Sequence, residues 1–138
     1  MRLLPMLLLV CLFMLSSLAA CAVAPPGQPA AVVPAAQIEA ANDYLGQSLI
    51  NLSTGYHALL EQQAAVDPAG AARLQAQAAP LLTDLQAATS AYRIATAASE
   101  QIRADNPAVN ATWGTALDAM SRVVGVVGPF ALRAVAGH

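Results

Sequence analysis

The chain has 138 residues, a length that accommodates one domain. Its six Lys and Arg residues against eight Asp and Glu residues give a net charge of −2, so it lacks the basic stripe with which proteins bind nucleic acid. Its two cysteines, Cys11 and Cys21, both lie near the amino terminus, which leaves the rest of the chain without a disulfide or a thiol site.

The amino-terminal segment has the three parts of a secretory signal. Arg2 supplies positive charge, Leu3–Leu18 forms an apolar core, and two alanines supply small residues before Cys21. The core is shorter than the roughly 20 apolar residues that a permanent membrane-spanning helix needs. We therefore expect this segment to be cleaved from the mature protein.

The end of this segment, Leu18-Ala19-Ala20-Cys21, resembles the lipobox of bacterial lipoproteins. The resemblance is confined to the amino-terminal segment and implies cleavage between Ala20 and Cys21, with an acylated Cys21 as the first mature residue. Ala22 behind it implies the outer membrane, facing the periplasm, in a cell with two membranes. Two or three acyl chains hold a protein stably at a bilayer. Ordinary secretion with cleavage after Ala24, and an uncleaved anchor, are the alternatives.

Residues 21–36 are expected to form the lipidated cysteine and a linker rich in proline and alanine. Its prolines, at positions 25, 26, 29 and 34, disfavour a helix and favour extended polyproline geometry. Such a tether would hold a domain of residues 37–138 up to roughly 40–45 Å from the membrane.

Residues 37–138 are predicted to be all-α and to form a small antiparallel three-helix bundle. The first helix begins at Gln37 and ends before Asp67-Pro68, which supplies a capping residue and a proline at the first helical position. The second helix runs from Pro68 to about Ala104 and is kinked at Pro80.

Asp105-Asn106-Pro107 repeats the stop-and-restart signal and begins the third helix, in which Gly128 marks a break or kink. Such short connections force neighbouring helices to be antiparallel, and no strand-like alternation competes with the helical pattern. The apolar run Val123–Leu132 in the third helix has only ten residues, which is too short to span a membrane.

Each predicted helix has one apolar seam with residues spaced by three, four or seven. The seam of the first helix contains Ile38, Leu45, Leu49, Leu52, Tyr56, Leu59 and Val66. The seam of the second contains Leu74, Ala78, Leu81, Leu85, Ala88, Tyr92, Ala95, Ser99 and Ile102. The seam of the third contains Val109, Trp113, Ala116, Met120, Val123, Val127 and Phe130. The many small residues predict tight helix contacts and a thin core.

One face of the first helix carries Ser53, His57 and Glu61, the residue types of a hydrolase triad. Hydrolysis also needs an oxyanion site and a nucleophile on a constrained turn or pocket edge, and a bundle helix supplies neither. We interpret the three residues as a polar outer face with a weak His57–Glu61 pair and predict no catalytic residue. Two ligands are fewer than a zinc site needs, so no metal and no cofactor are predicted.

Asp84, Glu100 and Asp118 are spread over more than one helix and are the other candidates for a metal site. The Glu-x-x-His signature of carboxylate-bridged metal bundles is missing, so we expect these carboxylates to be solvated. Asp118 with Arg122, and Glu100 with Arg103, have the spacing of ordinary helix-surface ion pairs.

Tyr56, Tyr92 and Trp113 each fall on a predicted inner seam, where core packing accounts for them. The alternative is an apolar groove at one end of the bundle, in which these aromatic residues bind a partner helix or a lipid-like ligand.

Arg122 and Arg133 share a face of the third helix if that helix is unbroken at Gly128. Beside Val124, Val126 and Leu132, they would allow the helix to lie against anionic lipid.

These features predict a lipid-anchored bacterial envelope protein that is not an enzyme and works by protein–protein contact, with no nucleic acid as a partner. A small domain with a thin core and no disulfide is only marginally stable, so a partner protein or self-association would supply the missing burial. The alternative function is a helical module that binds a lipid or another apolar small ligand, and a hydrolase is a third class.

Overall fold

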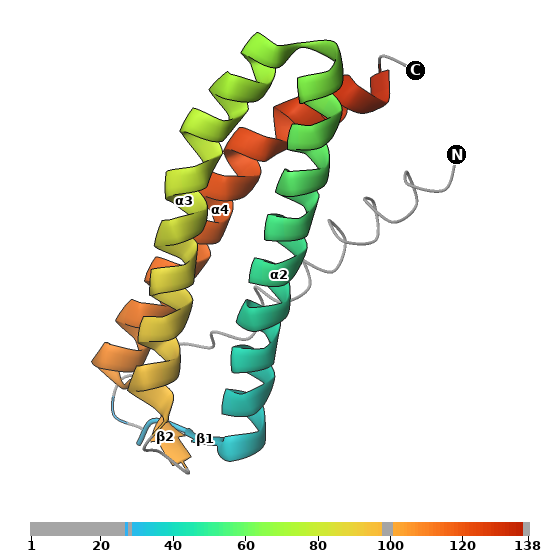
Figure 1. Ribbon diagram of the computed structural model, residues 1–138. Helices are drawn as coiled ribbons and strands as arrows, with labels where there is room; N and C mark the ends of the chain where they lie inside the picture. Colours follow the sequence, from blue (N-terminus) through green and yellow to red (C-terminus); the bar gives the residue numbers. More distant parts are fainter. Residues whose placement is uncertain (1–26, 28, 98–100, 137–138) are drawn as a thin grey trace. The chain divides into compact units, whose positions relative to one another are not determined.

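Three long helices form most of the protein in the computed structural model, which describes residue 27, residues 29–97 and residues 101–136. They are α2 (Ala35–Val66), α3 (Pro68–Thr96) and α4 (Pro107–Ala136). Successive helices run in opposite directions, and α3 packs against both α2 and α4 (Figure 1). The prediction of an all-α, antiparallel three-helix bundle is confirmed.

The turn between α2 and α3 forms as the sequence predicts. The Asp67 backbone N–H donates to the Gln63 carbonyl at 2.7 Å, which closes the end of α2. The Asp67 carboxylate then accepts a hydrogen bond of 2.9 Å from the Gly70 backbone N–H in the first turn of α3. Pro68 takes the first helical position, where a missing N–H costs nothing.

Two short strands lie at the opposite end of the bundle, where no strand was predicted. β1 (Val32–Pro34) pairs antiparallel with β2 (Gln101–Arg103), and Val33 lies opposite Ile102. β2 lies within the range predicted for the second helix. The observed helix, α3, ends at Thr96, so the predicted end near Ala104 is wrong. Strands of three residues are too short to show an alternating pattern.

Ile102 accounts for the overlong helix prediction. It follows the seam of the second helix at the correct spacing, and it is buried, at 5% exposure, but it belongs to β2. The spacing therefore predicted the burial of this side chain and not its secondary structure. Ser99, the seam residue before it, lies outside the described residues. β1 in turn lies inside the predicted linker, so the backbone of the linker's last residues is paired.

Neither α3 nor α4 is interrupted at its internal proline. α3 continues through Pro80, and α4 continues through Gly128 and Pro129 to Ala136. The carbonyls that Pro80 and Pro129 leave without a helical donor belong to Ala76 and Gly125, and both of these residues are exposed. The prediction that the second helical stretch is one helix through Pro80 is confirmed, and Gly128 does not break the third.

The core follows the predicted seams along most of their length. The largest fully buried side chains are Leu45, Leu74, Leu85 and Val123, contributed by all three helices. Near the α2–α3 turn, Tyr56 and Leu59 pack with Leu74 and Ala78, and the carboxyl-terminal half of α4 covers them. Val66 was predicted to lie on the α2 seam but is 82% exposed, because the core ends before the last turn of α2.

Candidate functional site

Ser53, His57 and Glu61 lie along α2 as their spacing requires, but they do not form a catalytic relay. Ser53 is half-buried, and His57 and Glu61 are exposed. No hydrogen bond or ion pair joins any two of the three within the described residues, so the predicted His57–Glu61 pair is not formed. The His57 ring instead lies 5.0 Å from the ring of Tyr56.

Asp84 and Asp118 meet at one guanidinium group. Arg122 lies 3.1 Å from Asp118, the predicted pair within α4, and 3.6 Å from Asp84 on α3. Asp84 was expected to be solvated, and its side chain is 56% exposed; the α3–α4 contact in addition provides it with a partner. Because all three side chains are about half exposed or more, each pair contributes only about 0–1 kcal/mol.

Carboxylates and histidines do not gather anywhere in the part of the chain that the structure describes. No group of three or more His, Cys, Asp or Glu residues there is close enough to hold a metal ion. Glu100, the third carboxylate singled out in the sequence, lies outside the described residues.

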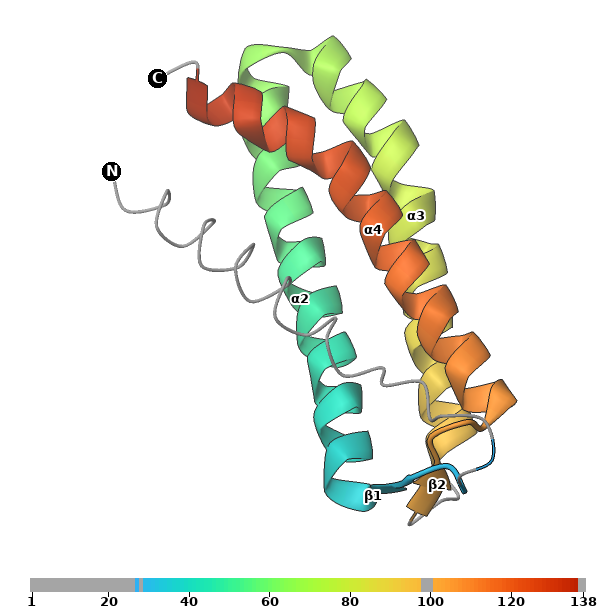
Figure 2. The same cartoon turned by 180° about the vertical axis from the view of Figure 1, so that it is seen from behind.

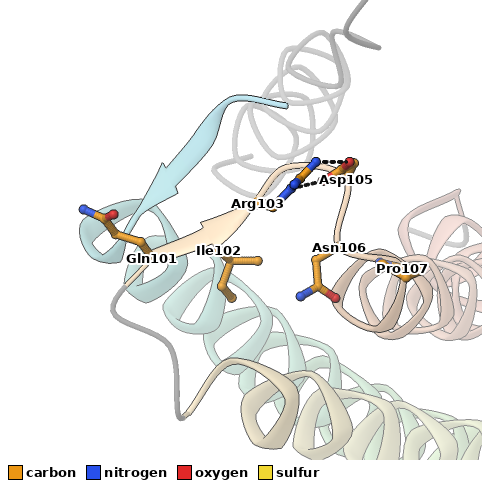
Figure 3. Close-up of a pocket in the computed structure, with 6 residues that line it drawn as sticks. All are labelled: Gln101, Ile102, Arg103, Asp105, Asn106 and Pro107. Carbon is orange, nitrogen blue, oxygen red and sulfur yellow. Dashed lines mark hydrogen bonds and ion pairs between the residues drawn. The ribbon is translucent and has the colours of Figure 1, made fainter. Parts of the chain in front are cut away.

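The β2–α4 connection forms a shallow hollow of about 450 Å³ (Figure 3). Arg103 and Asp105, two of its lining residues, point toward each other and form two hydrogen bonds of 3.0 and 2.9 Å. These bonds lower the pKa of the Asp105 carboxyl and raise the pKa of the Arg103 guanidinium. Arg103 is in β2 and not in a helix, and its observed partner is Asp105. The predicted pair with Glu100 falls on a residue outside the described ones.

Tyr92 and Trp113 lie together near the β-strand end of the bundle, with ring centroids 5.2 Å apart. Tyr44 on α2 joins them, 6.4 Å from Trp113, and its hydroxyl lies 4.0 Å from the Met120 sulfur. Burial raises the pKa of the Tyr92 phenol. Tyr44 was missed because it flanks the predicted seam, and only the placement of α4 beside α2 brings it to Trp113.

Tyr56 does not belong to this aromatic cluster. It is buried in the apolar cluster near the α2–α3 turn, with Leu59 and Leu74. It lies twelve positions after Tyr44 in α2, which is about 18 Å at 1.5 Å per residue. The three aromatic residues proposed for one groove are therefore divided between the two ends of the bundle.

A partly buried polar contact between α2 and α3 was also missed. The Asn42 amide donates to the Thr96 hydroxyl at 3.1 Å, and that hydroxyl donates to the Tyr92 carbonyl at 3.0 Å. Asn42 Oδ1 and the buried Thr89 hydroxyl have no hydrogen-bond partner among the described residues. The sequence carries no signal for this contact, because Asn42 and Thr96 are far apart in the chain.

α4 is the most apolar of the described helices. By length and composition alone it is long and apolar enough to cross a membrane, with a mean hydropathy of 1.4 over its best window. The prediction that the apolar run of this helix is too short to span a membrane rests on its ten uncharged residues, Val123–Leu132, whereas the whole helix has 30. Only 17% of that window is buried within the bundle, so much of the helix's apolar surface faces outward.

The two arginines of α4 have different surroundings. Arg122 is held by Asp84 and Asp118, whereas Arg133 is exposed and forms no ion pair with a described residue. Of the two arginines of α4, Arg133 is therefore the one without an ion pair to a described residue.

Ala20 and Cys21, the predicted cleavage and acylation positions, lie outside the described residues and remain predictions. The sequence matches no known family model, and neither curated proteins nor solved structures contain a significant match to it.

Proposed function

We propose that this chain is a lipid-anchored protein of the bacterial envelope that acts by protein–protein contact and not by catalysis. The observation that carries the proposal is Leu18-Ala19-Ala20-Cys21, a lipobox-like signal directly before a proline-rich tether and a helical body. In a cell with two membranes, the protein would face the periplasm from the outer membrane.

The beginning of the folded body supports a short tether. The compact unit starts at Val32, where β1 pairs with β2. The ten residues between Cys21 and β1 would extend over at most roughly 31 Å at 3.1 Å per residue. The anchor would therefore keep the bundle close to the bilayer and to its neighbours in the envelope.

The exposed apolar side chains support a role in contact. The core of the bundle is rich in alanine, whereas several larger apolar side chains lie outside it. Examples are Val66, Ile94 and Leu132, which are 82%, 77% and 62% exposed. Single exposed apolar residues are common, but a chain that leaves several of them outside a thin core gains stability when a partner covers them.

The anchor is tested by Cys21→Ser in the full chain expressed in a bacterium. Incorporation of labelled palmitate and recovery in the membrane fraction should both be lost, because the acylated sulfur is removed. Cys11→Ser is the matched control: it changes the other cysteine within the apolar core and should leave both readouts unchanged. A Cys21→Ser chain that still incorporates palmitate and stays in the membrane fraction would refute the proposed anchor.

Partners are tested by crosslinking the full chain in intact cells. A specific crosslinked species, either a second copy or another envelope protein, is expected for the wild-type protein. Recovery of a monomer alone would contradict a contact role.

The aromatic cluster of Tyr92 and Trp113 favours a second candidate function, the binding of a lipid or another apolar small ligand at the β-strand end of the bundle. Native mass spectrometry of the protein purified from membranes distinguishes the two functions. A retained lipid-sized mass that is lost with Trp113→Ala supports ligand binding.

A further inference from the structure

The outward surface of α4 differs from the outer faces expected of a soluble bundle. We define the α4 outer face as the exposed residues of its carboxyl-terminal half other than the paired Arg122, namely Val124, Gly125, Pro129, Leu132, Arg133, Val135 and Ala136. Val124, Leu132 and Val135 are 45%, 62% and 52% exposed. A surface helix normally presents polar and charged residues to water, and this face presents mainly apolar ones.

The opposite side of the same segment already has its partners. Val127, Phe130 and Ala134 pack against the apolar cluster around Tyr56 and Leu74. Figure 2 shows α4 lying in front of α2 and α3, with neither helix covering its front side. The α4 outer face is therefore additional to the core face, and nothing within the bundle covers it.

The charges of this segment all have one sign. From Ser121 to Ala136 there is no Asp or Glu, and the only charged residues are Arg122 and Arg133. Arg122 is paired with Asp84 and Asp118, so Arg133 supplies the free positive charge among the exposed apolar residues. An apolar helix face with a cation at its edge is complementary to a bilayer surface that contains anionic lipid.

We infer that the α4 outer face rests on the surface of an anionic lipid bilayer, with Leu132 and Val135 at the level of the acyl-chain boundary and Arg133 among the phosphates. The long Arg133 side chain can reach the headgroups while its stem lies along the apolar surface. α4 would lie in the membrane plane and not cross the bilayer, because its other face remains packed against α2 and α3.

This inference deepens the proposed function and rests on it, because the proposed lipid anchor is what would hold the bundle close to a bilayer. A tether of at most roughly 31 Å is shorter than α4, whose 30 residues extend over about 45 Å at 1.5 Å per residue. A bundle lying on α4 keeps both β1 and the α4 outer face within reach of the membrane that holds the anchor.

The test uses the full chain, purified from bacterial membranes and reconstituted into phosphatidylcholine vesicles with or without phosphatidylglycerol. Leu132→Trp places a fluorescent probe on the α4 outer face, and Thr54→Trp places the same probe on the exposed face of α2. Brominated lipids quench a tryptophan only at the acyl-chain boundary. The native Trp113 signal is subtracted by measuring the unsubstituted chain.

We expect brominated phosphatidylglycerol vesicles to quench the Leu132→Trp probe about threefold more than the Thr54→Trp probe, since only the former would lie at the bilayer boundary. In the Leu132→Trp chain, Arg133→Glu should remove most of this difference. The matched control Arg93→Glu reverses an exposed arginine on α3 and should not affect it. Equal quenching of the two probes would overturn the inference, as would a Leu132→Trp probe that is shielded by dimerisation and not by lipid.

Flotation of the same vesicles separates this inference from the proposed anchor. If wild type floats, Cys21→Ser does not and the Leu132→Trp probe is unquenched, the anchor stands and the inference fails. If Cys21→Ser floats as well as wild type and incorporates palmitate, the anchor fails. In a chain that carries both Cys21→Ser and Leu132→Trp, quenching of the tryptophan probe would then support the contact between the α4 outer face and the bilayer. An unquenched probe in that chain would refute this contact.

Discussion

Arg122 illustrates what single residues contribute to this fold. Its spacing from Asp118 was enough to predict a pair within α4, because residues four apart on a helix are neighbours. Its second partner, Asp84, belongs to α3 and depends on how the two helices pack. The Asn42–Thr96 hydrogen bond has the same origin. At this scale the sequence predicted the local Asp118–Arg122 pair, although the local His57–Glu61 pair that it also predicted is not formed, and packing adds the pairs between helices.

Tyr92 gives a prediction at the residue scale. Burial raises the pKa of its phenol, so the folded protein holds this proton more tightly than the unfolded chain does. The resulting stability is complete below the unfolded pKa, about 10, and is lost as the pH rises through the folded value. Urea unfolding at increasing alkaline pH should show the loss, and absorbance titration should show a late-ionising tyrosine.

Tyr92→Phe should reduce the alkaline loss of stability and abolish the late ionisation, while stability at pH 7 changes by no more than about 1 kcal/mol. Tyr56→Phe also removes a buried phenol hydroxyl and should leave the late ionisation in place. A late component that persists in Tyr92→Phe would show that the assignment is wrong.

The elements differ in how much of their boundaries the sequence reveals. Asp67-Pro68 predicted the α2–α3 turn because a capping carboxylate and a proline act through neighbouring backbone atoms. β1 and β2 were not predicted, because their pairing joins two three-residue segments far apart in the chain. Ile102 was predicted to be helical because its spacing continues the seam of the second helix. A single buried residue in a strand can have the same spacing.

Asp67 gives a prediction at the element scale. Asp67→Ala should lower the free energy of unfolding by about 0.5–2 kcal/mol, because the Gly70 N–H loses the acceptor that caps α3. Urea denaturation followed by circular dichroism measures the change.

Asp67→Asn is the matched control for the cap. It keeps a side-chain oxygen for the Gly70 N–H and removes only the charge facing Arg73, which lies 3.6 Å away and is largely exposed. It should therefore retain most of the stability that Asp67→Ala loses. Equal losses in the two variants would mean that charge, and not capping, stabilises this turn.

The whole molecule is a thin bundle in which α3 packs against both other helices. Leu74, at 0% exposure, lies in the cluster where all three helices meet, and alanines occupy much of the surrounding seam. Because alanine buries little apolar area, each large buried side chain contributes a substantial part of the stability.

Leu74→Ala should lower the free energy of unfolding by about 2–5 kcal/mol, a large part of what a small domain has. Leu132→Ala removes the same atoms from an exposed position and is the matched control. Measured in solution by thermal and urea unfolding, it should shift stability by no more than about 0.5 kcal/mol. Comparable losses in both variants would mean that the cluster around Leu74 is not the centre of the core.

The sequence by itself determined the helical class, the residues at which α3 and α4 begin and most of the buried seams, because spacing, capping and proline act over a few residues. Only the tertiary structure decided that Tyr56 lies apart from Tyr92 and Trp113, that Asp84 reaches Arg122, and that β1 pairs with β2. It also decided that one side of α4 is covered and the other is not. Periodicity identifies an apolar face, but only the packing of neighbouring helices shows which part of that face is buried.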